Sequence, residues 1–523
     1  MEARAWGWVV LALVCLAYLP SLWGGWVWDD WYQVAENPSL GDPLTLITSD
    51  VWSTTGVTRS DIYRPLFLLS FWPGQALFPG PLVERLVSLG LHLAAVSLVA
   101  SATRSLGTSQ AAAWFAAALF GLHPAGSEAV AWISARNDLL PTVLCLAAWR
   151  CWLSGRRGLA GVLLAFTPFC KESFLVAPAL LGVWMLGERR FSLRGLVAVG
   201  GGSILYVLVR TGLDLPLPAS SLDGAFVSAA GGGLRRLLEL LLLPYTADAL
   251  PQLAPSVVLG GAAVLLGLAL LVLSWGRPAV AGLTAVALTM VPSVLASAQL
   301  GLIADRYTYV LLGPLAVLAA IGLGGRCARS WLWILPVGLG ILTGVRAGDW
   351  TSDQRLFSAS LARDPTNSYA AFHLAYDLHT RHGDCAGAVP LYQLGLEVDA
   401  RAGTNLLACL VSTGRAEEAA TLGPELFRAH PESAPLAVNT ARALSMLGRV
   451  EAAELWCHEA LSLAPERCDL WIMLGNLLGL QGRLDEAGVA FQQAHGLGGD
   501  CRGEAEHWLG VIEAQRAATP TAP

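Results

Sequence analysis

The first two-thirds of the chain is a succession of apolar blocks separated by short polar clusters. An apolar helix of about 20 residues spans the hydrocarbon core of a bilayer, where every backbone polar group has to be bonded internally. Over the whole chain 54% of the residues are hydrophobic and 14% are charged, which is typical of an integral membrane protein. The sequence therefore predicts an all-α, polytopic bundle of membrane helices.

About eleven candidate spans precede residue 347, and several are short for a hydrocarbon core about 30 Å thick. They run near 6–23, 82–104, 109–122, 138–153, 158–170, 173–187, 193–211, 254–274, 277–297, 306–324 and 330–346. The first is interpreted as a retained span, because no small-residue cleavage site follows it. Residues 231–245 are ambiguous: we expect a helix lying at the outer interface, and a true span there would reverse the side of everything that follows.

Arginines indicate the orientation of these spans. With the N-terminus inside, the inner connections carry most of the arginines, as the positive-inside rule requires. These are Arg104, Arg150, Arg156, Arg157, Arg189, Arg190, Arg194, Arg277, Arg326 and Arg329. An odd number of spans then places the C-terminal part outside the cytosol. The net charge of −6, with no basic stripe, argues against nucleic acid as a partner.

The residues beyond 347 repeat with a period of 34. Gly414, Gly448 and Gly482 are each followed by arginine, and alanines keep the same spacing. This period, with small residues where paired helices touch, is the signature of tetratricopeptide repeats. We expect a membrane domain over 1–347, a repeat α-solenoid over 348–516 and a disordered tail over 517–523. Such solenoids bind peptides or proteins and seldom catalyse.

Five of the ten cysteines lie in the repeat part, and none of the ten shows metal-ligand spacing. They are Cys385, Cys409, Cys457, Cys468 and Cys501. If this part faces an oxidising compartment, one or two disulfides can form. The sequence alone does not pair them.

Ionisable residues recur where the spans meet the outer side of the bilayer. Asp29 and Asp30 follow the first span, although adjacent carboxylates at a membrane surface repel each other and lose hydration. The others are Arg64, His123, Glu128, Arg136, Asp138, Lys171, Glu172, Asp305 and Arg306. Lys171 is the only lysine of the chain. If the outer loops converge, acids and bases share one cleft, which predicts an interfacial active site.

Such a site suits transfer from a phosphate-linked donor. A carboxylate can take the proton from an attacking hydroxyl, and arginine or lysine offsets the charge that grows on a departing phosphate. Each group also has a structural alternative. Asp305 and Arg306 can cap a helix with a local ion pair, His123 can satisfy backbone groups at the end of a span, and Arg64 can anchor the interface.

The order of the motifs resembles a known family over nearly the whole chain. The motifs are WDD…ENP, YRPL, HPAGSEAVAWISARNDLL, CKES and ADRYTYV, followed by the repeats, with a further similar segment from Asp349 to Pro365. They resemble the transmembrane and tetratricopeptide-repeat protein O-mannosyltransferases that act on cadherins, with their bacterial relatives. That family belongs to the type C glycosyltransferases, whose active site faces the lumen or periplasm and whose donor is a polyprenyl-phosphate sugar.

The resemblance implies roles for the outer-loop residues. Asp29 or Asp30 would be the base that activates a Ser or Thr hydroxyl for inverting transfer, with Asp29 favoured. The candidates for binding the donor phosphate are Arg64, Arg136, Lys171 and Arg306. The supporting residues are His123, Glu128, Asp138, Glu172 and Asp305. No cofactor is expected, because the polyprenyl-phosphate sugar is a substrate. Members of this superfamily differ in needing a divalent metal, and none is predicted here, which leaves metal dependence open.

The expected function is transfer of a sugar, mannose being favoured, to exported proteins docked on the repeats. The expected location is a bacterial inner membrane, with the outer loops and repeats in the periplasm, or facing the lumen in a eukaryote. The repeats are fewer than in the animal proteins, which leaves the acceptor open. Two alternatives stand: a non-catalytic membrane scaffold for an envelope complex, and a polymerase or ligase of surface polysaccharide.

Overall fold

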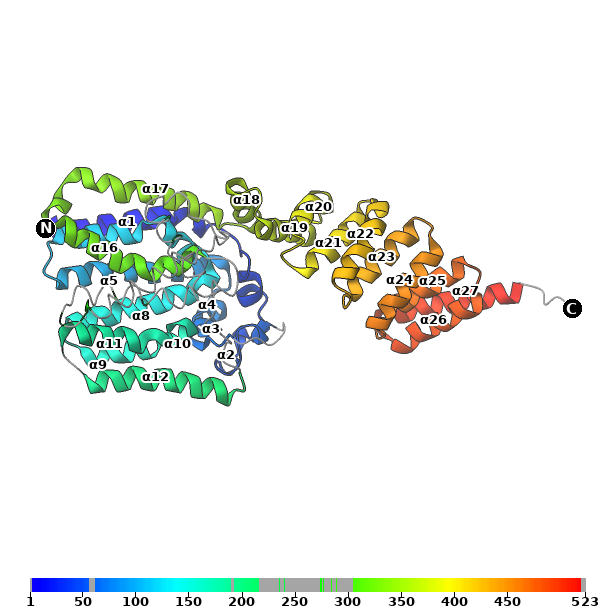
Figure 1. Ribbon diagram of the computed structural model, residues 1–523, viewed down its shortest axis with the longest axis horizontal. Coiled ribbons are helices and arrows are strands. Elements are labelled where there is room, and N and C mark those ends of the chain that lie inside the picture. Colours follow the sequence, from blue (N-terminus) through cyan, green and yellow to red (C-terminus); the bar gives the residue numbers. More distant parts are fainter. Residues whose placement is uncertain are drawn as a thin grey trace. The chain divides into compact units, whose positions relative to one another are not determined.

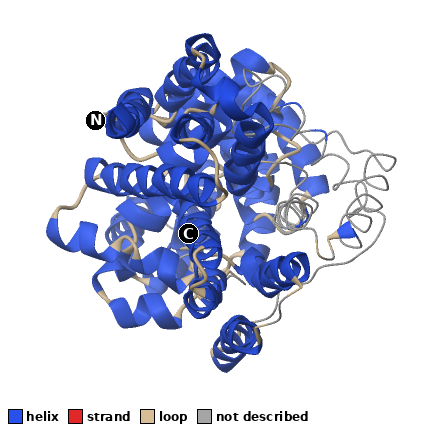
Figure 2. Ribbon diagram, turned by 90° about the vertical axis from the view of Figure 1, so that its left-hand side faces the viewer, coloured by secondary structure: helices blue, strands red, loops and turns tan. Residues whose placement is uncertain are grey.

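The computed structural model describes residues 2–55, 62–189, 192–215 and 304–518, with a few single residues between them. The predicted spans at 254–274 and 277–297, and the segment 231–245, lie outside the described residues, as does most of the predicted tail. The chain forms two compact units, Met1–Ala359 and Ser360–Pro523. In the described ranges the regular elements are helices, without strands (Figure 2).

Five helices of the described ranges are long and apolar enough to cross a membrane. They are α1 (Glu2–Leu22), α5 (Pro81–Ser105), α12 (Leu193–Gly212), α16 (Tyr309–Leu323) with the turns on either side of it, and α17 (Ile334–Asp349) with the turn before it. α1 packs beside α17, and α5 packs against its neighbours in the bundle (Figure 1). The protein is an integral membrane protein.

Shorter helices complete the bundle. They are α6 (Gln110–Gly121), α8 (Arg136–Leu153), α9 (Arg157–Ala165), α10 (Thr167–Cys170) and α11 (Ala177–Glu188). The span expected near 158–170 is therefore divided between α9 and α10. The break falls just before Pro168, which lies in the first turn of α10 and cannot continue the hydrogen bonding of a preceding helix.

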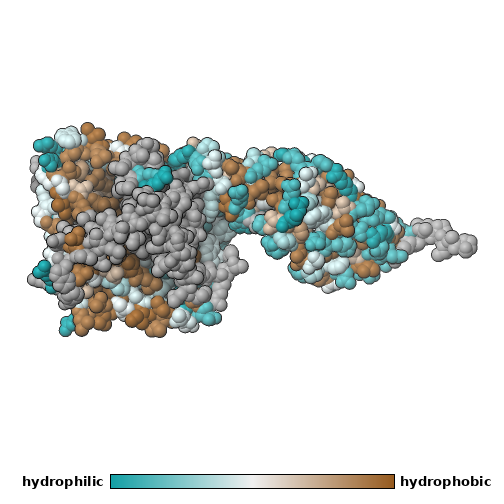
Figure 3. All heavy atoms as spheres, viewed as in Figure 1, coloured by the Kyte–Doolittle hydropathy of each residue, from teal (hydrophilic) through white to brown (hydrophobic). Residues whose placement is uncertain are grey.

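The flanks of the membrane unit are apolar (Figure 3). Leu16 on α1, Leu193 on α12 and Ile334 on α17 are largely exposed. Exposed leucine and isoleucine on several long apolar helices would be a liability in water but suit helix surfaces that face lipid. The surface of the repeat unit is more hydrophilic in the same view, as expected for a solvated domain.

Short helices form the polar loops of the membrane unit, which we name the outer loops after their predicted side. The first loop holds η1 (Trp31–Ala35), η2 (Pro38–Gly41), α2 (Pro43–Thr48), η3 (Ser53–Thr55), α3 (Pro65–Leu69) and α4 (Trp72–Leu77). The second outer loop holds η4 (Pro124–Gly126), α7 (Ser127–Ala131) and η5 (Ile133–Ala135), and the third holds η6 (Glu172–Val176). A later loop holds η8 (Asp305–Thr308). Polar caps fix these turns: Asn37 accepts a hydrogen bond from Ser39 N, and Asp42 accepts one from Leu44 N.

The repeat unit confirms the predicted solenoid. It follows α18 (Asp353–Arg363), a helix that begins in the membrane unit and ends in the repeat unit. The helix pairs are α19 (Ser368–His382) with α20 (Cys385–Leu394), α21 (Ala400–Ser412) with α22 (Ala416–Ala429), α23 (Ala434–Met446) with α24 (Val450–Leu463), and α25 (Cys468–Leu480) with α26 (Leu484–Leu497). α27 (Arg502–Ala518) caps the end of the stack.

A glycine with a positive φ angle lies in the turn of each of these four pairs, and in the first pair it is Gly383 (+68°). Gly414, Gly448 and Gly482 have φ angles of +76°, +70° and +76°. A side chain is disfavoured in this left-handed conformation, which explains why glycine recurs every 34 residues.

Two disulfides cross-link the repeats. Cys385 on α20 is bonded to Cys409 on α21, and Cys468 on α25 is bonded to Cys501 beyond α26. Cys457 is buried and not in a disulfide. The sequence allowed one or two disulfides without pairing them, and the fold supplies the pairing by bringing cysteines of neighbouring helices together.

Candidate functional site

Asp30 ties the first outer loop to the second. Its carboxylate is fully buried, and Oδ1 accepts hydrogen bonds from Ser134 N (2.8 Å) and Ser134 Oγ (2.7 Å), while Oδ2 accepts one from Val27 N (3.2 Å). Burial raises the pKa of Asp30 to about 6, against the opposing effects of Arg85 and these hydrogen bonds. With its oxygens already engaged, Asp30 has the surroundings of a structural carboxylate.

The carboxylate of the preceding residue, Asp29, lies in a different environment. Asp29 is only half-buried, and within the described ranges no group donates a hydrogen bond to its carboxylate. Burial raises the pKa of Asp29 to about 7; nearby Arg306 opposes this, and the negative charges of Asp30 and Asp353 add to it. A half-buried carboxylate with a pKa near neutrality has the properties of a general base.

Three tryptophans stack beside Asp29. The rings of Trp28 and Trp132 are stacked with their centroids 4.8 Å apart, and the rings of Trp132 and Trp350 follow at 5.4 Å. The guanidinium of Arg306 lies 4.9 Å from the centroid of the Trp132 ring. The stack joins residues from the first loop, the second loop and the end of α17, and it packs against one of the predicted cations.

Arg306 and Lys171 share acidic partners. The Arg306 guanidinium pairs with Glu128, whose second oxygen accepts a hydrogen bond from Arg306 N (2.9 Å). Lys171 Nζ lies 2.5 Å from Asp138 Oδ1, and Arg306 Nε lies 3.5 Å from Asp138 Oδ2. Both cations also lie over the ring of Tyr307, at 4.6 Å and 4.9 Å. The structure thus brings together the loop of Glu128 and Asp138, the loop of Lys171 and the loop of Arg306.

Glu128 is the second carboxyl group here with a pKa near neutrality. Burial raises its pKa to about 7, Arg306 opposes the rise, and the neighbouring negative charge of Asp305 adds to it. Asp305 is itself buried next to this group.

Arg64 joins the first loop to the third. Its guanidinium binds Glu172 with two hydrogen bonds, Nε to Oε2 at 2.8 Å and Nη2 to Oε1 at 2.5 Å. Burial acts to raise the pKa of Glu172, but the charge and hydrogen bonds of Arg64 outweigh it and lower the pKa to about 2. The pair is therefore ionised at any physiological pH, and it lies close enough to Asp138 for charge interaction.

The structure places Arg136 apart from the other predicted phosphate-binding cations. Its side chain is fully buried; Nη2 pairs with Glu84 Oε2 at 2.7 Å, Nη1 donates to Ser70 O at 2.9 Å, and the guanidinium lies over the ring of Phe71. These contacts engage the guanidinium of Arg136 inside the bundle, and its role at the donor phosphate stays a prediction.

His123 satisfies a backbone group at the end of a helix, which was the structural alternative to a role in the site. Its Nδ1 accepts a hydrogen bond from Ala125 N at 3.3 Å, capping η4. Burial lowers the pKa of His123 to about 4, so the imidazole is neutral near pH 7. A neutral capping imidazole holds the turn that precedes Glu128 and carries no charge for a phosphate.

Sequence reasoning missed four residues that build the site. Ser134 holds Asp30, and Tyr307 lies between Lys171 and Arg306. Glu84 pairs with Arg136, and Arg85 donates to the carbonyl oxygens of three loop residues, Gly25, Ala131 and Trp350. A signal existed for Glu84 and Arg85, because adjacent charges inside an apolar span are costly and therefore mark a functional or structural site.

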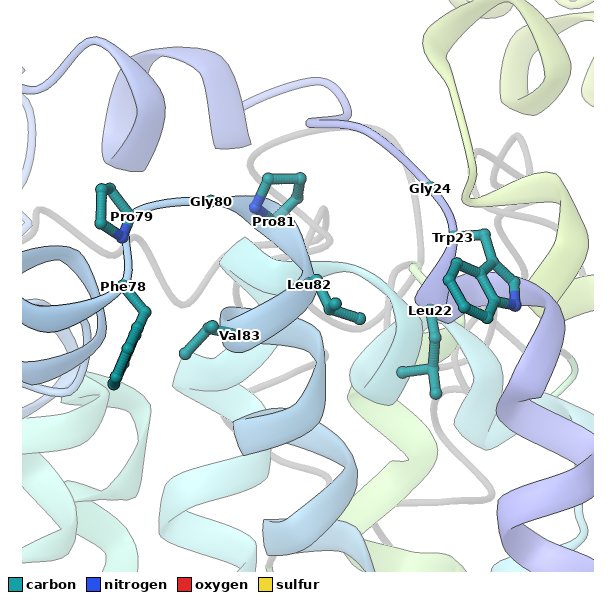
Figure 4. A pocket seen from close by; sticks show the side chains of 9 residues that line it. All are labelled: Leu22, Trp23, Gly24, Phe78, Pro79, Gly80, Pro81, Leu82 and Val83. Carbon is teal, nitrogen blue, oxygen red and sulfur yellow. The ribbon is translucent and has the colours of Figure 1, made fainter.

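An apolar hollow of about 460 Å³ lies where α1 ends and α5 begins (Figure 4). Its lining residues are Leu22, Trp23, Gly24, Phe78, Pro79, Gly80, Pro81, Leu82 and Val83. No ionisable side chain is among them, so the hollow suits an apolar group such as part of a lipid chain.

Metal-ligand chemistry is sparse in the described ranges. In these ranges, the side chains whose donor atoms lie close enough together to hold a metal ion are those of His379, Cys385 and Cys409. The two cysteines are joined in a disulfide. These cysteines are thus not available as thiolate ligands.

Comparison with curated proteins confirms the resemblance indicated by the motifs. The chain is 29% identical over 245 residues to protein O-mannosyl-transferase TMTC3 of Mus musculus, covering 45% of this chain and 25% of that protein. It is 35% identical over 189 residues to protein O-mannosyl-transferase Tmtc1 of Drosophila melanogaster, covering 33% of this chain and 22% of that protein. The chain thus spans about a quarter of the length of these relatives. No family model matches it.

Solved structures similar to the chain include repeat proteins. "YrrB: a TPR protein with an unusual peptide-binding site" is 21% identical, with a TM-score of 0.27, over 31% of this chain and 84% of that one. MamA is 16% identical, with a TM-score of 0.26, over 32% of this chain and 90% of that one. The assignment of the repeat unit as a solenoid depends on its own helix pairs and not on these similar structures.

Proposed function

We propose that the protein is a membrane glycosyltransferase that moves a mannosyl group from a polyprenyl phosphate to Ser or Thr hydroxyls of exported proteins. One observation carries the proposal: a half-buried Asp29, with its pKa raised to about 7, lies within charge range of Arg306 in a cluster that also holds Lys171. A base beside cations is what transfer from a phosphate-linked sugar requires. The similarity to O-mannosyl-transferases supports the same reading.

In this mechanism Asp29 takes the proton of the acceptor hydroxyl as its oxygen attacks the anomeric carbon. The bond between that carbon and the phosphate oxygen breaks, and its electron pair leaves with the polyprenyl phosphate. Lys171 and Arg306 stabilise the negative charge that grows on the leaving phosphate. Glu128 and Asp138 hold these cations in place by direct pairing, and Arg64 with Glu172 fixes the adjoining loop.

The sidedness of the reaction rests on two independent features. By the positive-inside rule, the connections that carry the arginine clusters are expected to face the cytosol, on the side opposite the polar loops. The repeat unit carries two disulfides, which persist in oxidising compartments such as the bacterial periplasm or the lumen. We therefore place the site and the repeats outside the cytosol, where the repeats would dock the acceptor polypeptide.

The function is tested by incubating the purified protein with polyprenyl-phosphate mannose, with and without exported host proteins. We expect release of polyprenyl phosphate that depends on the acceptor, and mannose on Ser or Thr of the modified proteins. Sugar on a glycan in place of protein would favour the polysaccharide enzyme. No release from this or other lipid-linked sugars would favour the scaffold.

The activity should depend on pH. Asp29 works as a base only when deprotonated, and its pKa of about 7 makes the ionised fraction rise between pH 6 and pH 8. We expect kcat to increase over this interval and to level off above pH 8. A profile of kcat at saturating donor checks this, and a flat profile between pH 5.5 and 8 would exclude Asp29 as the titrating base.

A further inference from the structure

The chain that leaves α17 returns to the start of the first outer loop. We call residues 350–357 the exit segment. Gly25 N donates a hydrogen bond to Thr351 O (2.9 Å), and Trp28 N donates one to Asp353 Oδ1 (2.5 Å). A Cβ atom placed on Gly24 would fall 2.7 Å from the Cα of Thr351, so the two backbones touch. The exit segment thus holds the residues that lead into Asp29.

Side chains reinforce this backbone contact. Arg85 Nη2 donates to Gly25 O (2.6 Å) and to Trp350 O (2.8 Å), which links the loop and the exit segment through one guanidinium. The ring of Phe357 meets the edge of the Trp28 ring, with centroids 6.0 Å apart. All of these residues lie within the membrane unit.

The contacts converge on a strained residue. Trp28 has a φ angle of +56°, in the left-handed region that a bulky side chain rarely adopts. Such a conformation costs free energy and persists only where the surroundings determine it. Here the stacked Trp132 ring holds the Trp28 side chain, and the Asp353 carboxylate holds its backbone N–H. The peptide that follows Trp28 carries Asp29, so this turn sets the direction of the Asp29 side chain.

We propose that Asp353 is a positioning residue for the transfer reaction: by accepting the hydrogen bond of Trp28 N, it fixes the left-handed turn that directs Asp29 into the site. The inference rests on the proposed function, in which Asp29 is the base. It makes the exit segment part of the catalytic unit and not merely a linker to the repeats.

An aspartate suits this place for two reasons. Asp353 is buried at the first turn of α18, where a carboxylate interacts favourably with the helix dipole. Its charge also acts on Asp29: the charged groups facing Asp29 are Arg306, Asp30 and Asp353, of which Arg306 lowers the pKa of Asp29 and the two aspartates raise it. Asp353 therefore acts on the candidate base through both geometry and charge.

Two variants separate these effects. Asp353→Ala removes the acceptor, and we expect kcat to fall by about 10- to 100-fold, since small misplacements of reacting groups have effects of this order, with the KM for the donor within about twofold of wild type. Asp353→Asn keeps an oxygen acceptor and removes the charge. It should retain most of kcat, and the midpoint of its pH profile should move to lower pH, because a charge that raises the pKa of Asp29 is lost.

The matched control is Asp42→Ala. Asp42 also lies in the first loop and also accepts a backbone hydrogen bond, from Leu44 N, but it is exposed and caps a different turn. We expect its kcat and pH profile to match wild type. Thermal unfolding in detergent is measured for each variant, so that kcat is compared between folded proteins.

The outcomes are distinguishable. If the wild type releases polyprenyl phosphate and Asp353→Ala keeps both wild-type kcat and pH profile, the positioning role is wrong while the function stands. Equal losses of kcat in Asp353→Ala and Asp353→Asn, with an unmoved pH midpoint, would also overturn it. If the wild type itself releases no lipid phosphate from any sugar donor, the proposed function fails first.

Discussion

Replacing Asp29 by asparagine is expected to lower kcat for sugar transfer by about 10²- to 10⁴-fold, the usual contribution of a general base. Asparagine has nearly the shape of aspartate but cannot accept the proton of the hydroxyl. The KM for the donor should change little, since the cations proposed to bind the phosphate are untouched. Release of polyprenyl phosphate at saturating donor measures the effect.

The adjacent position supplies the control. Asp30→Asn turns one carboxylate oxygen into an NH₂ group, which then meets either the donors of Ser134 or the N–H of Val27. We expect a lower thermal stability and a smaller loss of kcat in the folded fraction than for Asp29→Asn. If Asp30→Asn loses more turnover at equal folded fraction, the base is Asp30 and the assignment is reversed.

Replacing Glu84 by alanine should lower the free energy of unfolding by about 3–5 kcal/mol, because it leaves the buried charge of Arg136 without its partner. Both side chains of this pair are fully buried, and Nη2 and Oε2 are 2.7 Å apart. Reversible unfolding in mixed detergent micelles measures the loss, with turnover of the folded fraction recorded alongside.

Glu188→Ala is the control for an ion pair that is only partly buried. Glu188 pairs with Arg157 at 3.0 Å, but about a third of each side chain is exposed. Solvent screens such a pair, but Glu188 also accepts a hydrogen bond from Trp152 Nε1 (2.9 Å), so we expect a loss of about 1–2 kcal/mol, smaller than for Glu84→Ala. Equal changes for Glu84→Ala and Glu188→Ala would show that the buried pair is not structural.

Much of the fold could be predicted because it depends on local patterns. The apolar run of α5 and the 34-residue period of the repeats are properties of contiguous sequence, and both gave the observed elements. Long-range pairing is not local. Nothing in the sequence says that Cys468 faces Cys501. The break of the helix over 158–170 did have a local signal, Pro168, which the predicted span did not use.

The candidate site shows the same division. The motifs marked Lys171, Arg306 and the aspartate pair, since charged residues beside apolar spans stand out. They could not tell Asp29 from Asp30, because the difference lies in the hydrogen bonds from Ser134, which is more than 100 residues away in sequence. Nor could they separate Arg136 from Arg64: the residue type is the same, and only burial against Glu84 sets Arg136 apart.

The contacts of the first outer loop have a consequence for how the protein is made. That loop emerges early in synthesis, yet its partners arrive in turn: Arg85 lies 60 residues after Gly25, Ser134 lies 104 after Asp30, and Asp353 lies 325 after Trp28. Such non-local contacts form only after the intervening chain has been made and ordered. A nascent chain halted before the end of its last span would lack the contact between Trp28 and Asp353. The first outer loop would therefore be among the first parts synthesised and among the last to complete its contacts.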